Sequence, residues 1–340
     1  MDGTTTDVLA VGDVFLNRDR PATAFEHTRD LFEAADARIG NLEASVVGGT
    51  PANFRSLCIR MPTDAAGALG DAGFDVMSFA NNHAMDWGPD ALCETIERME
   101  ARGVAVAGAG ADRQAAERVA TTDVDGVTVG VVAFEATHAS FFFTMQADAR
   151  RAGMNMLSVS PLYPEPHVGA AELERLDRVV ADAAAEVDVL FALCHFGELI
   201  TADLTTTQRA IARRAVDAGA DAVVGSHPHV LQAVEVYRGA PICYSLGHFV
   251  FDSIREFGLS YLESVFPERS DDTAVARFAV DESGLEAMDL YPAYLDQAGD
   301  PRLASPDGSR FDAIAATLVD LSEREGTDLV RERDRVRVPI

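Results

Sequence analysis

The chain alternates short apolar runs with longer amphipathic stretches, and most of the runs end in a cluster of polar residues. Six such runs fall at residues 7–11, 75–80, 127–134, 187–194, 221–224 and 242–246. Their shortness and their β-branched or mixed composition predict buried strands. Stretches rich in Ala, Glu and Arg at residues 62–70, 89–101, 170–186, 206–218 and 311–324 are predicted helices. Strands that alternate with helices indicate an α/β fold.

The rest of the chain fits around this framework. Residues 274–280 and 285–295 alternate apolar and polar positions, which is typical of antiparallel strands. Residues 141–167 are irregular and carry several Pro, so we predict a long loop or lid over the site, and residues 48–51 mark another loop. Without a repeat or a clear linker, we expect one domain over residues 1–340. Its core motifs lie in residues 7–255, and residues 256–340 complete the fold.

The charge of the chain excludes several classes of protein. It has 340 residues and a formal net charge of -27, and all 28 of its cationic Lys or Arg side chains are Arg. The hydrophobic share of 48% is that of an ordinary globular protein, so the acidity does not indicate disorder. A nucleic-acid binder needs a basic stripe, and none is visible. The lack of Lys excludes Schiff-base and P-loop chemistry.

Dispersed acidic residues favour adaptation to a salty cytosol, where screening relieves the repulsion between them. An acidic surface for a cationic partner is the alternative. The sequence contains no apolar stretch of 18 residues, which a membrane-spanning helix would require. Its first residues do not resemble a secretory signal, so we expect a cytoplasmic protein. The four Cys are widely separated, which favours buried thiols in a reducing cytosol over a zinc-thiolate or disulfide site.

Polar side chains gather where the predicted strands end. Ligands of open α/β folds bind at the carboxyl ends of strands. The residues found there are Asp13, Glu43, Asn82, His83, His195, His227 and His229. Carboxylate, amide and imidazole donors suit Mn, Fe or Zn better than a thiolate site would. The sequence therefore predicts a divalent metal site.

Taken singly, each of these elements has a simpler explanation. Asp13 is compatible with a turn, Glu43 with a helix cap or a surface acid, residues 81–83 with a turn before the next helix, and His195 with a buried, hydrogen-bonded histidine. His227-Pro228-His229 indicates metal binding more strongly, because two imidazoles one residue apart on an extended segment can point to the same side. The whole set is more specific than any member.

Six motifs occur in order and together resemble a known family. They are Gly12-Asp13-Val14-Phe15-Leu16-Asn17-Arg18, Asn41-Leu42-Glu43, Asn81-Asn82-His83-Ala84-Met85-Asp86-Trp87-Gly88, His195-Phe196-Gly197-Glu198, Gly225-Ser226-His227-Pro228-His229-Val230 and Tyr244-Ser245-Leu246-Gly247-His248-Phe249. The resemblance is to the CapA family of poly-γ-glutamate capsule synthesis proteins, within the calcineurin-like metallophosphoesterases, and covers roughly residues 7–255. It implies a metallophosphoesterase-like two-sheet β-sandwich flanked by helices (α/β/β/α), with a two-metal site at one edge.

The resemblance also implies roles for individual residues. Asp13 resembles the first-motif aspartate, and Glu43 stands where the superfamily places its metal-bridging acid. The remaining ligands that the resemblance implies are Asn82, His195, His227 and His229. His83 resembles the histidine that contacts the reacting phosphate or the leaving group. Asp86 either orients His83 or caps the helix that begins near Pro89.

Two positions depart from the family pattern. The superfamily usually begins with Asp-x-His, whereas this chain has Phe15 two residues after Asp13. One metal therefore loses a ligand, and the site is either mononuclear or dinuclear with a weaker second ion. The family usually reads Leu-Gly-Asn-Phe where this chain has His248. His248 either adds a ligand or replaces a hydrogen bond, and we favour the hydrogen bond.

The sequence thus predicts a metal-dependent hydrolase, most simply a phosphatase or phosphodiesterase that uses one or two Mn, Fe or Zn ions. Arg18 would hold an anionic substrate unless it is a surface residue, and Glu198 would support His195 or contact substrate. The expected partner is a small anionic substrate or poly-γ-glutamate. The alternatives are a factor that binds or cleaves poly-γ-glutamate, weakened by the lack of an N-terminal anchor, and a non-catalytic assembly subunit, against which the intact ligand set argues.

Overall fold

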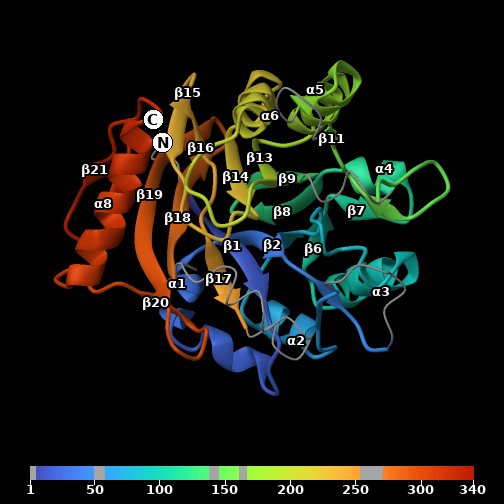
Figure 1. Cartoon of the computed structure of the whole chain (residues 1–340), viewed down its shortest axis with the longest axis horizontal. Coiled ribbons are helices and arrows are strands. Elements are labelled where there is room, and N and C mark those ends of the chain that lie inside the picture. Colours follow the sequence, from blue (N-terminus) through green and yellow to red (C-terminus); the bar gives the residue numbers. More distant parts are fainter. Residues whose placement is uncertain (1–4, 50–57, 138–144, 161–166, 253–270) are drawn as a thin grey trace.

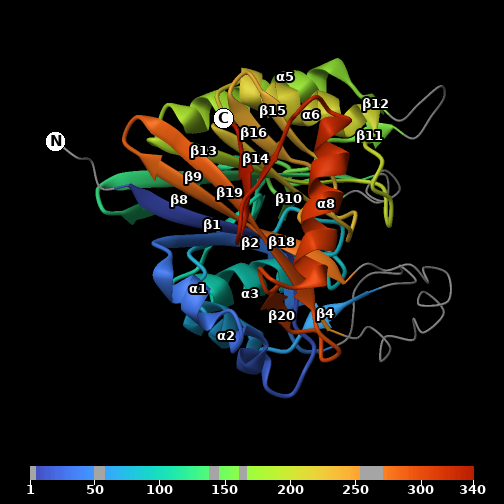
Figure 2. The ribbon, with the colours of Figure 1, turned by 90° about the vertical axis from the view of Figure 1, so that its left-hand side faces the viewer.

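The computed structural model describes residues 5–49, 58–137, 145–160, 167–252 and 271–340. Two large sheets pack face to face, and helices cover their outer faces (Figure 1; Figure 2). The first sheet holds ten strands of the described chain: β1 (Thr6–Phe15), β2 (Ala37–Leu42), β5 (Val76–Ser78), β6 (Ala105–Ala107), β17 (His248–Phe251), β18 (Asp272–Asp281), β19 (Gly284–Leu295), β20 (Pro301–Leu303), β21 (Val330–Arg331) and β22 (Val336–Val338).

The second sheet and the remaining elements complete the described chain. The six strands of the second sheet are β8 (Ala120–Val124), β9 (Val127–Thr137), β13 (Val189–Gly197), β14 (Ala222–Ser226), β15 (Val234–Tyr237) and β16 (Ala240–Cys243). Three small sheets pair β3 (Ser45–Val46) with β4 (Arg60–Met61), β7 (Ala109–Gly110) with β10 (Gly153–Met154), and β11 (Val159–Ser160) with β12 (His167–Val168). The helices are η1 (Pro21–Phe25), α1 (Arg29–Ala34), α2 (Ala65–Asp71), α3 (Pro89–Glu100), α4 (Arg113–Glu117), α5 (Ala170–Ala184), α6 (Thr206–Asp217) and α8 (Ser309–Glu323).

Alternation along the strands separates three apolar layers. In β1, Val8 and Ala10 point into the layer between the two sheets, whereas Leu9 and Val11 point into the layer under α1, α2 and α3. A third apolar layer lies between the second sheet and helices α5 and α6. Strands β1, β2 and β5 of the first sheet, and β9, β13 and β14 of the second, pair in parallel and are mostly buried, as is typical of parallel strands covered on both faces. The predicted α/β/β/α fold is confirmed, and Figure 2 shows α5 and α6 on one side and α1 to α3 on the other.

Each of the six predicted strands and five predicted helices is present, with shifted ends. The run at residues 242–246 leaves its strand after Cys243, and η1, α1 and α4 were not predicted from the sequence. Strands β18 and β19 pair antiparallel, as expected, and β18 also pairs with β1. The predicted lid at residues 141–167 lies partly outside the described residues, and its described part contains β10 and β11. Among the described helices, none combines the length and the apolar character that crossing a bilayer requires.

Candidate metal centre

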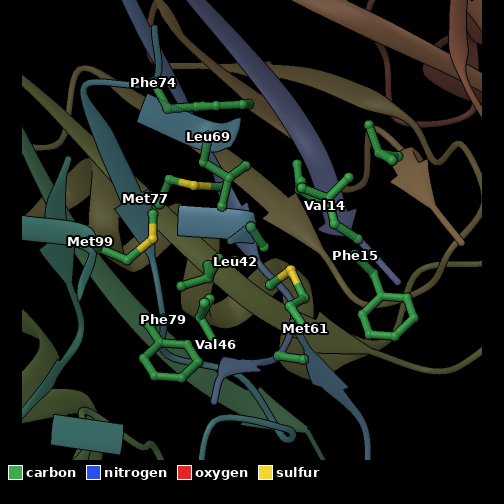
Figure 3. Close-up of a cluster of buried hydrophobic side chains, with 14 of the residues drawn as sticks. Val14, Phe15, Leu42, Val46, Met61, Leu69, Phe74, Met77, Phe79 and Met99 are labelled. Carbon is green, nitrogen blue, oxygen red and sulfur yellow. The ribbon is translucent and has the colours of Figure 1, made fainter. Parts of the chain in front are cut away.

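The predicted site residues lie at one edge of the sandwich, where β1, β2, β5, β13 and β14 end and β17 begins. An apolar cluster beneath the first sheet supports this edge, and Figure 3 shows Val14, Phe15 and Leu42 among its members. Polar and apolar residues are interleaved here, since Asp13 directly precedes Val14 and Leu42 directly precedes Glu43. The apolar side chains therefore anchor the strand ends, and their polar neighbours are left for the site.

A close backbone contact places Asp13. The amide of Asp13 donates to the carbonyl of Gly247 over 3.1 Å. A Cβ on Gly12 would stand 1.9 Å from that same oxygen, so only glycine allows the approach at position 12. The pairing of β1 with β17 also shifts register between Asp13 and Val14, and such irregularities re-aim side chains. Asp13 is fully buried as a result.

Asn41 links the two buried carboxylates. Its Nδ2 atom donates to Asp13 Oδ1 over 2.9 Å and to Glu43 Oε2 over 2.6 Å. Asn81 fixes this amide in turn, because its own Nδ2 donates to Asn41 Oδ1 over 3.1 Å and to the Leu42 carbonyl over 2.7 Å. Burial and the neighbouring charge of Asp13 raise the pKa of Glu43 well above its usual value. Two carboxylates in this setting repel each other unless a cation lies between them.

The other side of the site consists of imidazole and amide groups. His195 Nε2 lies 2.8 Å from Asn82 Oδ1 and 3.2 Å from His227 Nδ1, and His195 Nδ1 lies 2.8 Å from Ser226 Oγ. Burial and the positive charge that His227, His229 and His83 would carry lower the pKa of His195 well below its usual value. The ring is therefore neutral near pH 7, which is the form that binds metal ions.

The loop after β14 brings two more imidazoles to the carboxylates. His227 and His229 both have positive φ, at 96° and 59°, in the left-handed region that non-glycine residues rarely occupy. Such strain concentrates at functional sites, where surrounding structure holds it. The conformation puts His229 Nδ1 3.0 Å from Asp13 Oδ2 and the His227 amide 3.4 Å from the same oxygen. The loop thus joins the two sides of the site.

These donors fit a divalent cation. Asp13, Glu43 and His195 offer ligand atoms within 4.8 Å of one another, and so do Asp13, His229 and His248. We call these the His195 group and the His248 group, and they share Asp13. Glu43 Oε1 is buried without a hydrogen-bond partner, which is costly unless another ligand satisfies it. Hard and borderline donors of this kind suit Mn, Fe or Zn.

His83 and Asp86 form a pair at the edge of the ligand cluster. His83 Nδ1 lies 2.7 Å from Asp86 Oδ2, which also accepts from the Ile59 amide over 3.1 Å. Asp86 is fully buried, so the position of its carboxylate fits the predicted role of orienting the imidazole. The N-cap of α3 is Gly88, without a side-chain cap, so Asp86 does not cap that helix.

Two further predicted residues lie apart from the donors. The guanidinium of Arg18 contacts both carboxylate oxygens of Asp252 and one oxygen of Asp300, and it donates to the Ala298 carbonyl over 3.2 Å. Glu198 is exposed, just beyond the end of β13. A substrate role for Arg18 or Glu198 therefore stays a prediction.

Sequence reasoning did not assign roles to Asn41, Asn81 and Ser226, although each lies inside a quoted motif. Their position next to a predicted ligand is the feature that points to them: Ser226 precedes His227, and Asn81 precedes Asn82. The four cysteines carry thiols rather than disulfides, and none of them belongs to the His195 group or the His248 group. Cys194 and Cys243 are buried, and burial raises the pKa of the Cys194 thiol to about 12.

Comparison with known proteins places the chain in a family. The model for the bacterial capsule synthesis protein PGA_cap matches residues 7–253. The chain belongs to this family. It is 28% identical over 306 residues to the PGA biosynthesis protein CapA of Bacillus subtilis (strain 168), which covers 86% of this chain and 73% of that protein. It is also 28% identical over 304 residues to the capsule biosynthesis protein CapA of Bacillus anthracis, covering 86% and 68%. The resemblance seen in the motifs is thus confirmed.

A solved structure supports the fold. A hypothetical protein from Thermus thermophilus superposes with a TM-score of 0.53 and 18% identity, and the match covers 84% of this chain and 98% of that one. At this level of identity the likeness shows the fold alone.

Proposed function

We propose that this PGA_cap family member is a metal-dependent hydrolase of the phosphatase or phosphodiesterase type. The observation that carries the proposal is the convergence of the six predicted ligands, which come from β1, β13 and three loops that follow strands. They are Asp13, Glu43, Asn82, His195, His227 and His229. A fold does not require Asp13 and Glu43 to be buried side by side, because burying two carboxylates together destabilises it. A cation-binding function explains why the set is there.

The residues divide the work of the proposed reaction. When bound, one or two divalent ions supply Lewis acidity and lower the pKa of water to about 7. Asp13 and Glu43 supply the negative charge that holds the ions, and Asn41 keeps the two carboxylates apart at fixed positions. The imidazoles of His195, His227 and His229 would bind the ions through their ring nitrogens. The burial of His195 and His227 excludes bulk water from this side of the site.

His83 is the proposed proton donor to the leaving group. With Nδ1 directed at Asp86, the Nε2 atom is the ring position left to exchange a proton with substrate. The backbone amide of His83 donates to Asn81 Oδ1 over 3.1 Å, so the residue is tied to the same network that orients the carboxylates. The network would thus hold His83 at a fixed position relative to the ions, although His83 does not bind them.

The acidic surface bears on the conditions of the reaction. A net charge of -27 repels anionic substrates at low ionic strength, whereas at about 1 M salt the Debye length is only about 3 Å. We propose that the protein works in a salty cytoplasm, where a local site of ions and imidazoles can hold a phosphate ester. Glu198 is the proposed contact at the rim of this site, whereas the contacts of Arg18 with Asp252 and Asp300 favour a structural role for that residue.

The relatives favour a second candidate function. Two of them are named for PGA or capsule biosynthesis, and a Mycobacterium tuberculosis (strain CDC 1551 / Oshkosh) relative, 31% identical over 226 residues, is named a probable polyglutamine synthesis accessory protein. That match covers 64% of this chain and 56% of the relative. In this case the same metal site would bind or cleave poly-γ-glutamate, a polymer whose carboxylates and amides are ligands for the same kinds of ion.

Metal analysis followed by hydrolysis assays tests the proposal. The protein is purified in about 2 M KCl, loaded with Mn, Zn or Fe, and assayed on a phosphomonoester, a phosphodiester and a γ-glutamyl polymer. Asn82→Ala and His229→Ala should lose metal and activity, whereas His167→Ala removes an exposed imidazole on β12 and should change neither.

The outcomes separate the candidate functions. Hydrolysis of phosphate esters that depends on Asn82 and His229 supports the phosphatase. Cleavage of polymer alone supports the second candidate. Retention of no metal, with unchanged behaviour of both variants, would refute the enzyme and leave an assembly subunit.

A further inference from the structure

His248 is built into the site by the same backbone contact that places Asp13. It begins β17 and pairs with Asp13 in the parallel register of β17 and β1, which lie side by side in Figure 1. Gly247 has a φ of 76°, and its carbonyl oxygen accepts a hydrogen bond from the Asp13 amide. The turn at Gly247 and the missing Cβ of Gly12 therefore fix His248 next to the shared carboxylate. Only 2% of His248 is exposed.

The rings around His248 are arranged as a pair of donors with an aromatic support. The centroids of His248 and His229 lie 4.5 Å apart, with 36° between their planes. Phe251 packs 4.2 Å from the ring of His248 and 5.2 Å from that of His229, so one apolar side chain holds both imidazoles. His229 Nδ1 is 3.0 Å from Asp13 Oδ2. A carboxylate and two imidazoles thus meet in a buried space.

Phe15, on the neighbouring strand, shows why the imidazole comes from β17. Phe15 is fully buried in the apolar cluster of Figure 3, and its ring lies 5.2 Å from that of Phe251. Phe251 therefore separates an apolar layer, which contains Phe15, from the polar His248 group. The position two residues after Asp13 serves the core, and the imidazole beside Asp13 is supplied across the β1–β17 ladder instead.

We propose that His248 is a ligand of the ion that Asp13 and His229 hold, which makes the site dinuclear. This inference rests on the proposed metal site and replaces the hydrogen-bonding role expected from the sequence. Two adjacent imidazoles would repel each other if both were protonated, and as neutral rings they offer lone pairs to a shared cation. One carboxylate and two imidazoles form a three-residue donor set of the kind found in catalytic sites that keep a position open for water or substrate.

Metal stoichiometry of His248→Ala tests the proposal without relying on activity. Wild type in about 2 M KCl should bind two Mn per chain by elemental analysis and show a spin-coupled pair by electron paramagnetic resonance. His248→Ala should lower the affinity for one ion by more than about 100-fold, since losing even the hydrogen-bond partner of a ligand lowers metal affinity by about 10- to 100-fold. The coupled signal should then disappear while the other ion remains. The double variant His248→Ala/His229→Ala should lose no further ion, because both side chains serve the same one.

Two control variants show whether the loss of an ion is specific to His248. His167→Ala removes an exposed imidazole from β12 and should leave both ions bound. His27→Ala tests a separate surface group, His27, Asp296 and Asp300, whose members contact Arg302 or Arg18, and should also leave the count unchanged. If His248→Ala does not fold, anomalous diffraction from Mn-loaded wild-type crystals should show a peak within about 2.3 Å of an imidazole nitrogen of His248.

The proposal is wrong if His248→Ala folds and keeps two ions with wild-type affinity, or if no anomalous peak lies at ligand distance from His248. Failure of the proposed function looks different. Wild type would then hold both ions, lose one in His248→Ala, and still hydrolyse none of the phosphate esters. Wild type that binds no ion overturns both proposals.

Discussion

The His195 group and the His248 group share Asp13, but different forces hold them in place. In the His195 group, side-chain hydrogen bonds orient the donors: Ser226 contacts one nitrogen of His195 and Asn82 the other, both at 2.8 Å. In the His248 group, a backbone contact at Gly12 and ring packing on Phe251 do so. The His195 group thus depends on polar hydrogen-bond partners, whereas the His248 group depends on the absence of a side chain at Gly12.

This difference predicts which ion is held more firmly. Hydrogen-bonded ligands are pre-oriented and lose little freedom when the ion binds, whereas packed rings rely on shape alone. We therefore expect the ion of the His195 group to bind more tightly. Substitutions that remove polar partners should affect the His195 group, and substitutions that enlarge glycine should affect the His248 group.

Asp13→Ala should have the largest effect, because it removes the one ligand that both groups use. Loss of both ions should lower kcat/KM roughly 10⁴-fold, since metal ions contribute several kcal/mol of charge stabilisation and each 1.4 kcal/mol is about tenfold. Elemental analysis and steady-state kinetics on the same preparation measure the two losses. Asp7→Ala, near the start of the same strand, is the control and should retain both ions. A variant at position 13 that still holds two ions would show that the groups do not share a ligand.

His83→Ala should separate proton transfer from metal binding. The residue contacts Asp86 rather than the shared carboxylate, so both ions should remain while kcat falls about 100- to 1,000-fold. A substrate with a good leaving group, which needs no protonation, should lose much less. Equal losses for good and poor leaving groups would contradict the assignment of His83 as proton donor, and loss of an ion would make it a ligand.

Gly12→Ala should weaken the His248 group through the backbone. A Cβ would stand 1.9 Å from the Gly247 carbonyl, so β1 and β17 must separate, at a cost of about 1–3 kcal/mol in the free energy of unfolding. The weaker ion should be lost first, which is measurable by titrating Mn back into metal-free protein. Gly169→Ala is the control, because a Cβ there meets no atom within 4 Å. Wild-type stability and affinity in Gly12→Ala would show that the close contact does not hold Asp13.

The sequence predicted the layers of the fold well, because they follow from local patterns. Strand β13 is apolar at nearly every position and carries His195 near its end, so both its burial and the polar residue near its end are visible in the sequence. The helices η1, α1 and α4 were missed because they are short, and short helices depend on tertiary packing rather than on propensity. Their positions follow from contacts that the local pattern does not contain.

The predicted ligands were identified by type and spacing, but the roles of their neighbours needed three-dimensional contacts. Asn41 is 28 residues from Asp13 in the chain, and only the register of β1 with β2 brings its amide to that carboxylate. For His248 the sequence leaves a ligand role and a hydrogen-bonding role open and favours the hydrogen bond. The ring separation of 4.5 Å from His229 supports the proposed ligand role.

Ser226→Ala should weaken the His195 group by about tenfold in metal affinity. Removing the hydroxyl leaves His195 Nδ1 without its 2.8 Å partner, and outer hydrogen bonds of this kind contribute about 10- to 100-fold. The two groups should then have similar metal affinities, or the ion of the His195 group should be lost first on dilution. Ser283→Ala, at an exposed turn, is the matched control. An unchanged affinity would mean that packing, as in the His248 group, also orients His195.

Arg18→Gln should have the smallest effect on activity. It distinguishes a structural role of Arg18, in which the side chain holds chain segments together, from a role in binding substrate. Arg18 ties the end of β1 to Asp252 after β17 and to Asp300, so it closes the same strand pair that builds the His248 group. Its loss should lower the free energy of unfolding by about 2 kcal/mol, typical of hydrogen bonds to charged groups, and leave KM within about threefold. Arg20→Gln, exposed two residues later, should change neither. A large rise in KM with unchanged stability would instead assign Arg18 to the anionic substrate, and would place substrate on the His248 side of the site.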